Sequence, residues 1–228
     1  WQMSPVAESS EKKGAAKTGL NPTQYIDDDL FGFMDADKKE TLTRTSPVRV
    51  DALLALTSYK GDLDFGTNYM AKAIGGNPNI FETEIHSGIY RGTILIELDR
   101  VGCGEGFKEK TITNEEKAKR VLGLLDAFQM LWSSGRQSRF LADISPKFIA
   151  AAYLKAKNPV FLEAVNLTAA GKLDTAKLTS VVSDYERFMS GHVFAAQEGV
   201  FEKVEGITSL KEGFAQIQAW VKDYYQVG

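Results

Sequence analysis

Apolar residues recur with helical spacing in three stretches of the chain. A capping box at Thr113 and Glu116 opens the first stretch, which we expect to end near Ser134, and Ser209 with Glu212 opens the third. The apolar faces are Ala118, Val121, Leu122, Leu125, Phe128 and Trp132; Leu178, Val181, Val182, Tyr185 and Met189; and Phe214, Ile217, Val221 and Tyr224. The pattern therefore predicts three amphipathic helices.

Short runs of apolar and β-branched residues predict strands between these helices. The runs lie at 30–34, 48–56, 88–99, around 148–153 and at 160–167. The second and third runs are separated by a stretch rich in Gly, Asn, Asp and Pro, roughly 25 residues long, which is unusual for a loop in a compact domain. Strands and helices alternate irregularly. We therefore expect an α+β fold in one elaborated domain.

Composition indicates an ordinary globular domain, and local charge adds a possible partner. Of the 228 residues, 43% are apolar and 25% are charged, which excludes a disordered chain and a disulfide scaffold. The net charge of −3 argues against a protein that coats nucleic acid indiscriminately. Residues 117–157, however, hold 8 basic and 2 acidic residues with aromatic residues interleaved. This segment is a candidate face for a polyanion.

Cysteine usage and hydropathy indicate the compartment. Cys103 is the single cysteine and cannot form an internal disulfide, which favours the reducing cytoplasm. No apolar run approaches the roughly 20 residues that cross a bilayer, and residues 1–20 lack the apolar stretch of a secretory signal. We expect a cytoplasmic protein with no membrane partner.

Several acidic and histidine-containing motifs are weak candidates for metal binding or catalysis. Glu82, Glu84 and His86 alternate and would share one face of a strand, but a solvated polar face explains them better. Residues 27–29 are three consecutive Asp, which we interpret as a solvated loop. No nucleophile elbow accompanies His86 or His192. We therefore expect no catalytic residue, no metal and no cofactor.

Two motifs combine cations with features that suit nucleic acid. The segment RTSPVR at 44–49 offers two guanidinium groups, hydroxyls and backbone amides, which suits phosphate and equally suits a turn with two solvated Arg side chains. Tyr90-Arg91-Gly92 places an aromatic residue beside a cation where Gly permits close backbone approach, although Arg91 is also compatible with the solvent face of a strand.

Six segments form a specific combination in a fixed order. They are LFGFM (30–34), RTSPVRV (44–50), YKGDLDFGTN (59–68), NPNIFETEIHSGIYRGT (77–93), LDRVG (98–102) and GRQSRFLADISPKFIAAAYL (135–154). Together they resemble the DevR-type CRISPR-associated backbone protein, the family-seven Cas subunit of type I-B Cascade. The resemblance is strong over about residues 30–155 and loose in the C-terminal third.

The resemblance implies an RNA-recognition-motif-like (RRM-like, ferredoxin-like) palm with an inserted β-hairpin thumb and additional helices. It implies that 1–228 is a single palm domain, for which we expect the strand and helix that open family members to be missing, and that 59–84 is the candidate thumb. Several copies are expected to line up along one guide RNA (crRNA). Further partners are target DNA, through the guide heteroduplex, and other Cascade subunits, in antiviral defence.

Candidate RNA contacts follow from this role, because a subunit that repeats along an arbitrary guide must hold phosphates and sugars rather than read bases. The expected phosphate contacts are Arg44, Arg49, Arg136, Arg139 and Lys147. Their expected hydrogen-bonding partners are Ser46, Thr67, Asn68 and Gln137. The apolar wedge of the thumb is expected to comprise Leu63, Phe65, Tyr69 and Met70.

Three alternatives stay open at this point. Related type III backbone subunits cut RNA with a thumb Asp, and Asp62 and Asp64 lie in the candidate thumb, so a metal-dependent ribonuclease is one alternative. The same backbone role in an RNA-guided CRISPR-associated transposon is another. A transcriptional regulator is the third, although no recognition-helix pair supports it.

Overall fold

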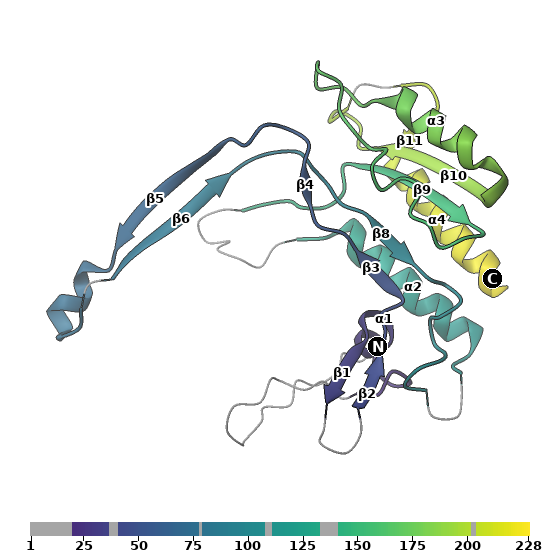
Figure 1. Cartoon of the computed structure of the whole chain (residues 1–228), viewed down its shortest axis with the longest axis horizontal. Coiled ribbons are helices and arrows are strands. Elements are labelled where there is room, and N and C mark those ends of the chain that lie inside the picture. The colour runs from purple at the N-terminus through teal and green to yellow at the C-terminus, as the bar shows by residue number, and fades with distance from the viewer. Residues whose placement is uncertain (1–19, 37–40, 78, 108–110, 133–140, 202–203) are drawn as a thin grey trace. The chain divides into compact units, whose positions relative to one another are not determined.

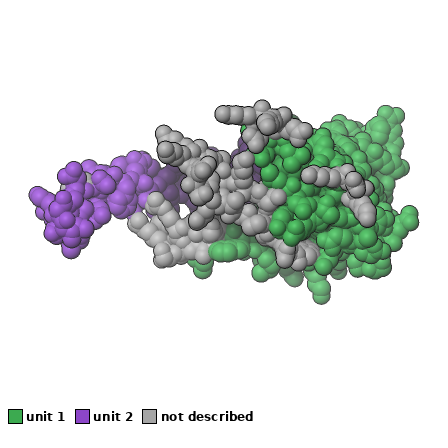
Figure 2. Space-filling model, turned by 90° about the horizontal axis from the view of Figure 1, so that it is seen from below, with its two compact units in different colours: residues 1–50, 94–228 green, residues 51–93 purple. Residues whose placement is uncertain are grey.

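The computed structural model describes residues 20–36, 41–77, 79–107, 111–132, 141–201 and 204–228. The chain divides into two compact units, Trp1–Val50 with Ile94–Gly228, and Asp51–Thr93. Figure 1 labels the helices and strands, and Figure 2 colours the two units. The chain combines helices with several small sheets, so the expected α+β class is confirmed. The finer RRM-like arrangement stays a prediction.

The larger unit begins with a short helix and a β-hairpin. Helix α1 (Ile26–Phe31) leads through Gly32 into β1 (Phe33–Ala36), which pairs antiparallel with β2 (Thr41–Arg44). Gly32 has a φ of 70°, and a Cβ there would collide with the Arg44 carbonyl oxygen, so only Gly fits. The predicted strand at 30–34 is therefore wrong in its first half, because Leu30 belongs to α1.

Two pairs of short strands lie where the chain passes from the larger unit into the smaller one and back. β3 (Val48–Val50) pairs antiparallel with β8 (Ile94–Ile96), and β4 (Leu54–Ala55) pairs with β7 (Tyr90–Arg91) inside the smaller unit. The predicted strands at 48–56 and 88–99 thus exist as pairs of shorter strands, each interrupted where one unit gives way to the other.

Helices α2 (Asn114–Gln129) and α4 (Leu210–Tyr225) lie against one another and confirm two of the predicted helices. The Thr113 hydroxyl accepts the Glu116 backbone N–H at 3.3 Å, and Ser209 with Glu212 forms a complete capping box. Tyr225, not the predicted Tyr224, is the buried tyrosine of α4. Burial raises the pKa of its hydroxyl, which donates to the Leu98 carbonyl oxygen at 2.6 Å.

A three-stranded sheet carries α4 on one face. β9 (Phe148–Leu154) pairs antiparallel with β10 (Met189–Ala196), and β11 (Thr208–Ser209) joins β10 in parallel. Tyr153 stacks on Trp220 of α4 with ring centroids 6.1 Å apart. Gly213 of α4 lies so close to Ala195 that a Cβ there would collide with it.

A second apolar core includes Phe148, Ala150 and Ala152 of β9 and Met189 and Phe194 of β10. It is built on Phe161, Ala164 and Leu178, the last from α3 (Thr175–Tyr185). A 3₁₀ turn, η2 (Glu186–Phe188), then ends the helix before the predicted limit, because Met189 already begins β10. The predicted strand at 160–167 is wrong, because this segment forms a series of turns. Its apolar residues contribute to the second core from these turns.

The first apolar core of the larger unit is built on Leu30, Val48, Val101, Ala118, Val121, Leu125, Val221 and Tyr225. The same unit contains a buried ionic cluster centred on Asp29. The Asp29 carboxylate pairs with Arg44 of β2 and with Arg120 of α2, whose Nη1 lies 2.8 Å from Oδ2. The Gly102 backbone N–H also donates to this carboxylate, at 3.0 Å. The expectation that residues 27–29 form a solvated loop is therefore wrong, since Asp28 and Asp29 are fully buried in α1. We call Asp29, Arg44 and Arg120 the Asp29 cluster.

The smaller unit is dominated by a long two-stranded ribbon (Figure 1). β5 (Gly61–Thr67) and β6 (Ile80–His86) pair antiparallel over their whole length, and a 3₁₀ helix, η1 (Tyr69–Ile74), lies between them. We call residues 61–86 the hairpin. The predicted insertion at 59–84 falls almost entirely on it.

In the described part of the chain, no helix combines the length and apolar character needed to cross a bilayer.

Removing the central carboxylate charge should destabilise the larger unit strongly. The substitution Asp29→Asn removes the buried counterion of two guanidinium groups and leaves Arg120 only its pair with Glu116 at 3.2 Å, so the free energy of unfolding should fall by about 3–5 kcal/mol. Chemical denaturation measures this loss. Asp184→Asn, an exposed residue of α3, is the matched control and should change stability by less than about 0.5 kcal/mol. Equal stability of the two variants would contradict the central role of Asp29.

Candidate nucleic-acid interface

A second carboxylate, Glu97, organises cations at the surface of the larger unit. Glu97 follows β8 directly, and its backbone N–H donates to the Pro47 carbonyl oxygen at 2.9 Å. Its nearly buried carboxylate pairs with Arg49 of β3, with Lys157 at 2.8 Å and with Arg100 at 3.6 Å. We call these four residues the Glu97 cluster. Three segments far apart in the sequence thus place their cations around one anion.

Electrostatics keep the Glu97 cluster ionised. Burial opposes ionisation of Glu97, but the Lys157 hydrogen bond and the charges of Arg49, Lys157 and Arg100 together outweigh it, so the pKa of Glu97 lies below its ordinary value. The hydrogen bond to Asp99, at 2.7 Å, followed by that to Glu97, raises the pKa of Lys157. Glu97 and Lys157 are therefore both charged at neutral pH.

Two cations of the Glu97 cluster keep much of their surface in solvent. The side chain of Arg49 is 56% exposed and that of Lys157 is 51% exposed, whereas that of Glu97 is 2% exposed. A guanidinium has five N–H donors and an ammonium three, so Arg49 beside Glu97, and Lys157 beside Glu97 and Asp99, each keep at least one donor for a phosphate. Asp99 pairs with Lys157 and Glu105 with Arg100, so three carboxylates balance the three cations and the site has no net positive charge. The arrangement suits one or two phosphate contacts at fixed positions.

Arg44 is not available for phosphate, which corrects the prediction for this residue. Its side chain is 1% exposed, and its nitrogens donate to the Asp29 carboxylate and to backbone carbonyl oxygens. Those oxygens belong to Asp29 (2.9 Å), Cys103 (2.9 Å), Glu105 (2.8 Å) and Arg100 (3.0 Å). Phe107 also lies under the guanidinium, 4.8 Å from ring centroid to Cζ. Arg44 therefore holds the fold together.

Ser46 is likewise committed to the fold. Its hydroxyl lies 2.9 Å from the Leu30 carbonyl oxygen and also against that of Val48. Of the RTSPVR motif, the structure thus leaves Arg49 as the cation that faces solvent. The structural expectation for this motif therefore holds for Arg44, and a phosphate contact by Arg49 stays a prediction.

The remaining predicted phosphate contacts have different outcomes. Arg136, Gln137 and Arg139 lie outside the described residues. Lys147 pairs with Asp143 at 2.5 Å and bonds the Ser145 hydroxyl at 3.0 Å. The hydrogen bond from Lys147, followed by those from the Ser145 hydroxyl and backbone N–H, lowers the pKa of Asp143. Lys147 is thus partly engaged by its own loop.

The hairpin exposes the apolar side chains predicted for it. Leu63, Phe65, Tyr69 and Met70 are all exposed, as are Ile74, Ile80 and Phe81. Thr67 and Asn68, at the end of β5, are exposed as well. The hairpin contains four carboxylates and one Lys, so it carries the whole formal net charge of −3 of the chain. Its surface is therefore apolar and acidic, which disfavours extensive phosphate contact.

Lys157 is the site residue that the sequence-based list of contacts omits. It lies in the basic segment 117–157, but so do seven other cations, and nothing in the local sequence marks it. What distinguishes it is the contact with Glu97, sixty residues away along the chain. Long-range pairing of this kind leaves no local signal.

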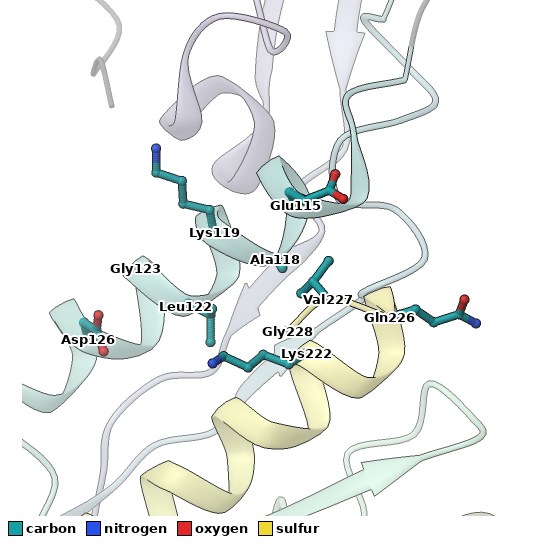
Figure 3. A pocket seen from close by; sticks show the side chains of 10 residues that line it. All are labelled: Glu115, Ala118, Lys119, Leu122, Gly123, Asp126, Lys222, Gln226, Val227 and Gly228. Carbon is teal, nitrogen blue, oxygen red and sulfur yellow. The ribbon is translucent and has the colours of Figure 1, made fainter.

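A hollow of about 440 Å³ lies between α2 and α4. Figure 3 shows its lining, in which the polar ends of Glu115, Lys119 and Gln226 point in different directions. Because these groups do not converge, the hollow offers no catalytic arrangement. In the described residues there is also no group of three His, Cys, Asp or Glu side chains that could hold a metal ion.

Comparison with known proteins gives a consistent family. Residues 8–175 match the family model of the CRISPR-associated negative auto-regulator DevR/Csa2. A curated relative, the CRISPR-associated protein Cas7/Cst2/DevR of Myxococcus xanthus (strain DK1622), is 29% identical over 167 residues, which are 68% of this chain and 51% of the relative. The chain thus spans about half the length of that relative.

Two solved structures share the fold. A chain of a CRISPR RNA-guided surveillance complex, pre-nicking, matches with a TM-score of 0.57 and 17% identity, over 95% of this chain and 62% of that one. A chain of a second CRISPR RNA-guided surveillance complex matches with a TM-score of 0.53 and 18% identity, over 87% and 78% of the two chains. At these identities the likeness establishes the fold.

The Glu97 cluster should make stability depend on pH. Because the pKa of folded Glu97 lies below its ordinary value near 4.5, its ionised form stabilises the fold above that pH, and the contribution is lost as the pH falls through the folded-state pKa. The difference in unfolding free energy between wild type and Glu97→Gln should therefore be larger at pH 7 than at pH 3. Urea denaturation at both pH values measures it. The same comparison for the exposed Glu163 should be flat, and a flat result for Glu97→Gln would contradict the assignment.

Proposed function

The chain belongs to the DevR/Csa2 family of CRISPR-associated proteins, and from this premise we propose that it is a guide-RNA-binding backbone subunit of a type I-B Cascade surveillance complex. The family match over residues 8–175 is the observation that carries the proposal. In this role, copies of the chain follow one another along a crRNA in the cytoplasm, together with other Cascade subunits. The role is one of binding, and target DNA is recognised by pairing with the guide.

The Glu97 cluster is the part of the larger unit that best suits the RNA backbone. A subunit that serves any guide sequence must contact phosphates and sugars and leave the base edges free. Arg49 and Lys157 meet this need because each is half exposed and each is held by the same carboxylate. Their positions are fixed before RNA arrives, so less side-chain entropy is lost on binding.

We assign the hairpin the role of the thumb. A two-stranded hairpin is only marginally stable in water by itself, and exposed apolar side chains are typical of an interaction surface. The exposed side chains of the hairpin therefore indicate a binding partner. In the proposed assembly the hairpin of one copy reaches the RNA bound by the next and displaces a nucleotide. Leu63, Phe65, Tyr69 and Met70 supply the apolar wedge, while the carboxylates keep phosphates away from the stem.

Phosphate contacts by Arg49 and Lys157 should appear in the salt dependence of RNA binding. Each contact to a single strand contributes about −0.7 to the slope of log K against log salt. Arg49→Ala and Lys157→Ala should each weaken binding of a guide-length RNA and reduce the slope by about that amount, as filter binding at several salt concentrations would measure. Lys177→Ala, an exposed Lys of α3, should leave both quantities unchanged. An unchanged slope in both site variants would refute the proposed contacts.

The ribonuclease alternative is tested with the hairpin aspartates. Asp62 and Asp64 are two residues apart on β5 and therefore share one face of the ribbon. We expect guide-length RNA to stay intact when it is incubated with the purified chain and Mg²⁺ or Mn²⁺, and Asp62→Asn with Asp64→Asn to change nothing. Gel analysis of labelled RNA reads this out. Metal-dependent cleavage that the double substitution abolishes would replace the binding role with a catalytic one.

A further inference from the structure

One backbone amide of the RTSPVR motif binds a carboxylate of the protein itself. The Thr45 backbone N–H donates to Glu105 Oε2 at 2.9 Å, and the Thr45 hydroxyl also hydrogen-bonds to Glu105. Arg100 Nη2 lies 3.8 Å from the same carboxylate oxygen and donates to the Thr45 carbonyl oxygen at 3.0 Å. A backbone N–H, a hydroxyl and a guanidinium therefore surround one anion. We call Thr45 and Arg100 the anion site.

The residues on either side of Thr45 hold the anion site in place. Arg44 is buried among its hydrogen-bond partners, and the Ser46 hydroxyl lies 2.9 Å from the Leu30 carbonyl oxygen. The hydrogen bond from Arg100 fixes the Thr45 carbonyl oxygen. The direction of the Thr45 N–H is therefore set by the fold, and little conformational freedom is lost when an anion binds there.

The Glu105 carboxylate is able to leave the anion site without a change in the backbone. The Glu105 carbonyl oxygen accepts a hydrogen bond from Arg44 Nη1 at 2.8 Å, which fixes the backbone of this residue. Its side chain, however, is 55% exposed, and exposed side chains change rotamer within nanoseconds. Rotation of this side chain into solvent frees the Thr45 N–H and the Arg100 guanidinium for another anion.

The anion site favours negative charge and lies beside the proposed RNA contacts. The hydrogen bond from the Thr45 backbone N–H, followed by that from its hydroxyl, lowers the pKa of Glu105, although desolvation opposes this. Backbone N–H groups, hydroxyls and guanidinium groups are also the donors that proteins use to hold phosphate oxygens. Arg100 pairs with Glu97 as well, so the anion site adjoins the other cations of the Glu97 cluster.

We propose that the anion site binds a phosphate of the RNA backbone, and that Glu105 occupies the site as a phosphate mimic until RNA displaces its carboxylate. The exchange replaces one anion by another, so Thr45 and Arg100 keep a partner throughout. It also gives the Glu97 cluster, whose three cations are balanced by three carboxylates, a positive local charge when RNA binds. Glu105 thereby lowers the affinity for RNA. The inference rests on the proposed function, because the phosphate belongs to RNA that the chain holds.

Removing the Glu105 carboxylate should tighten RNA binding. Glu105→Ala leaves the anion site open, so the dissociation constant for a labelled guide-length RNA should fall by about fivefold, the scale of one exposed ion pair. Filter binding at physiological salt measures this change. Glu105→Gln keeps the shape of the side chain without its charge and should give a smaller gain. Glu163→Ala removes an exposed carboxylate elsewhere on the larger unit and is the matched control, with a change below about twofold.

Arg100→Gln separates exchange at the anion site from a general loss of negative charge. In this background the site is incomplete, so Glu105→Ala should gain less than about twofold, whereas a general electrostatic effect gives the same gain with or without Arg100. An equal gain in both backgrounds, or no gain from Glu105→Ala in the wild-type background, would overturn the anion site. A gain for inorganic phosphate alone, measured by calorimetry, would overturn it as well, because the ligand is then a free anion.

The same assay keeps the anion site and the proposed function apart. If Glu105→Ala gave no gain but Arg49→Ala and Lys157→Ala still weakened binding, the proposed function would stand without the anion site. Failure of both the wild type and Glu105→Ala to bind RNA would refute both.

Discussion

The larger unit depends on one buried carboxylate. Asp29 lies on a helix of six residues, too short to be stable by itself, yet it meets Arg44 from β2, Arg120 from α2 and the backbone of Gly102. Arg120 also donates to the carbonyl oxygens of Pro22 and Thr23, at 2.6 and 2.8 Å. Four segments therefore converge on a buried point. Charges in such a place are stable only with complete hydrogen bonding, so the cluster fixes the relative positions of these segments closely.

Glu97 is a second buried carboxylate that pairs with several cations, but its cations are placed differently. Its carboxylate is nearly as inaccessible as that of Asp29, but two of its cationic partners face solvent instead of the core. In the Asp29 cluster, backbone carbonyl oxygens accept hydrogen bonds from both guanidinium groups. In the Glu97 cluster, the two solvent-facing cations keep N–H donors for another partner. Burial of the anion and exposure of the cations together make a surface whose positive groups are rigid. The difference between the buried Arg44 and the solvent-facing Arg49 of RTSPVR thus lies in what surrounds each guanidinium.

Local patterns predicted the elements whose signals are local. The cap at Thr113, the capping box at Ser209 and the apolar run of β9 were all recognisable from the sequence. The fate of Arg44 was not, because it depends on Asp29 and on carbonyl oxygens some sixty residues away. The turns at 160–167 also escaped prediction, since Phe161 and Ala164 are buried without regular structure. The position of Lys157 likewise depends on a long-range contact, with Glu97, which composition does not reveal.

The ribbon of β5 and β6 has a consequence for solubility. In the described part of this sheet each strand pairs with one neighbour, so each also presents an open edge of unpaired backbone groups. Open edges beside apolar side chains are templates for edge-to-edge aggregation. Asp62, Asp64, Glu82 and Glu84 lie along both strands of this ribbon. The negative charges of two such ribbons repel each other at short range, which opposes edge-to-edge pairing. This repulsion protects chains that lie near one another from aggregation.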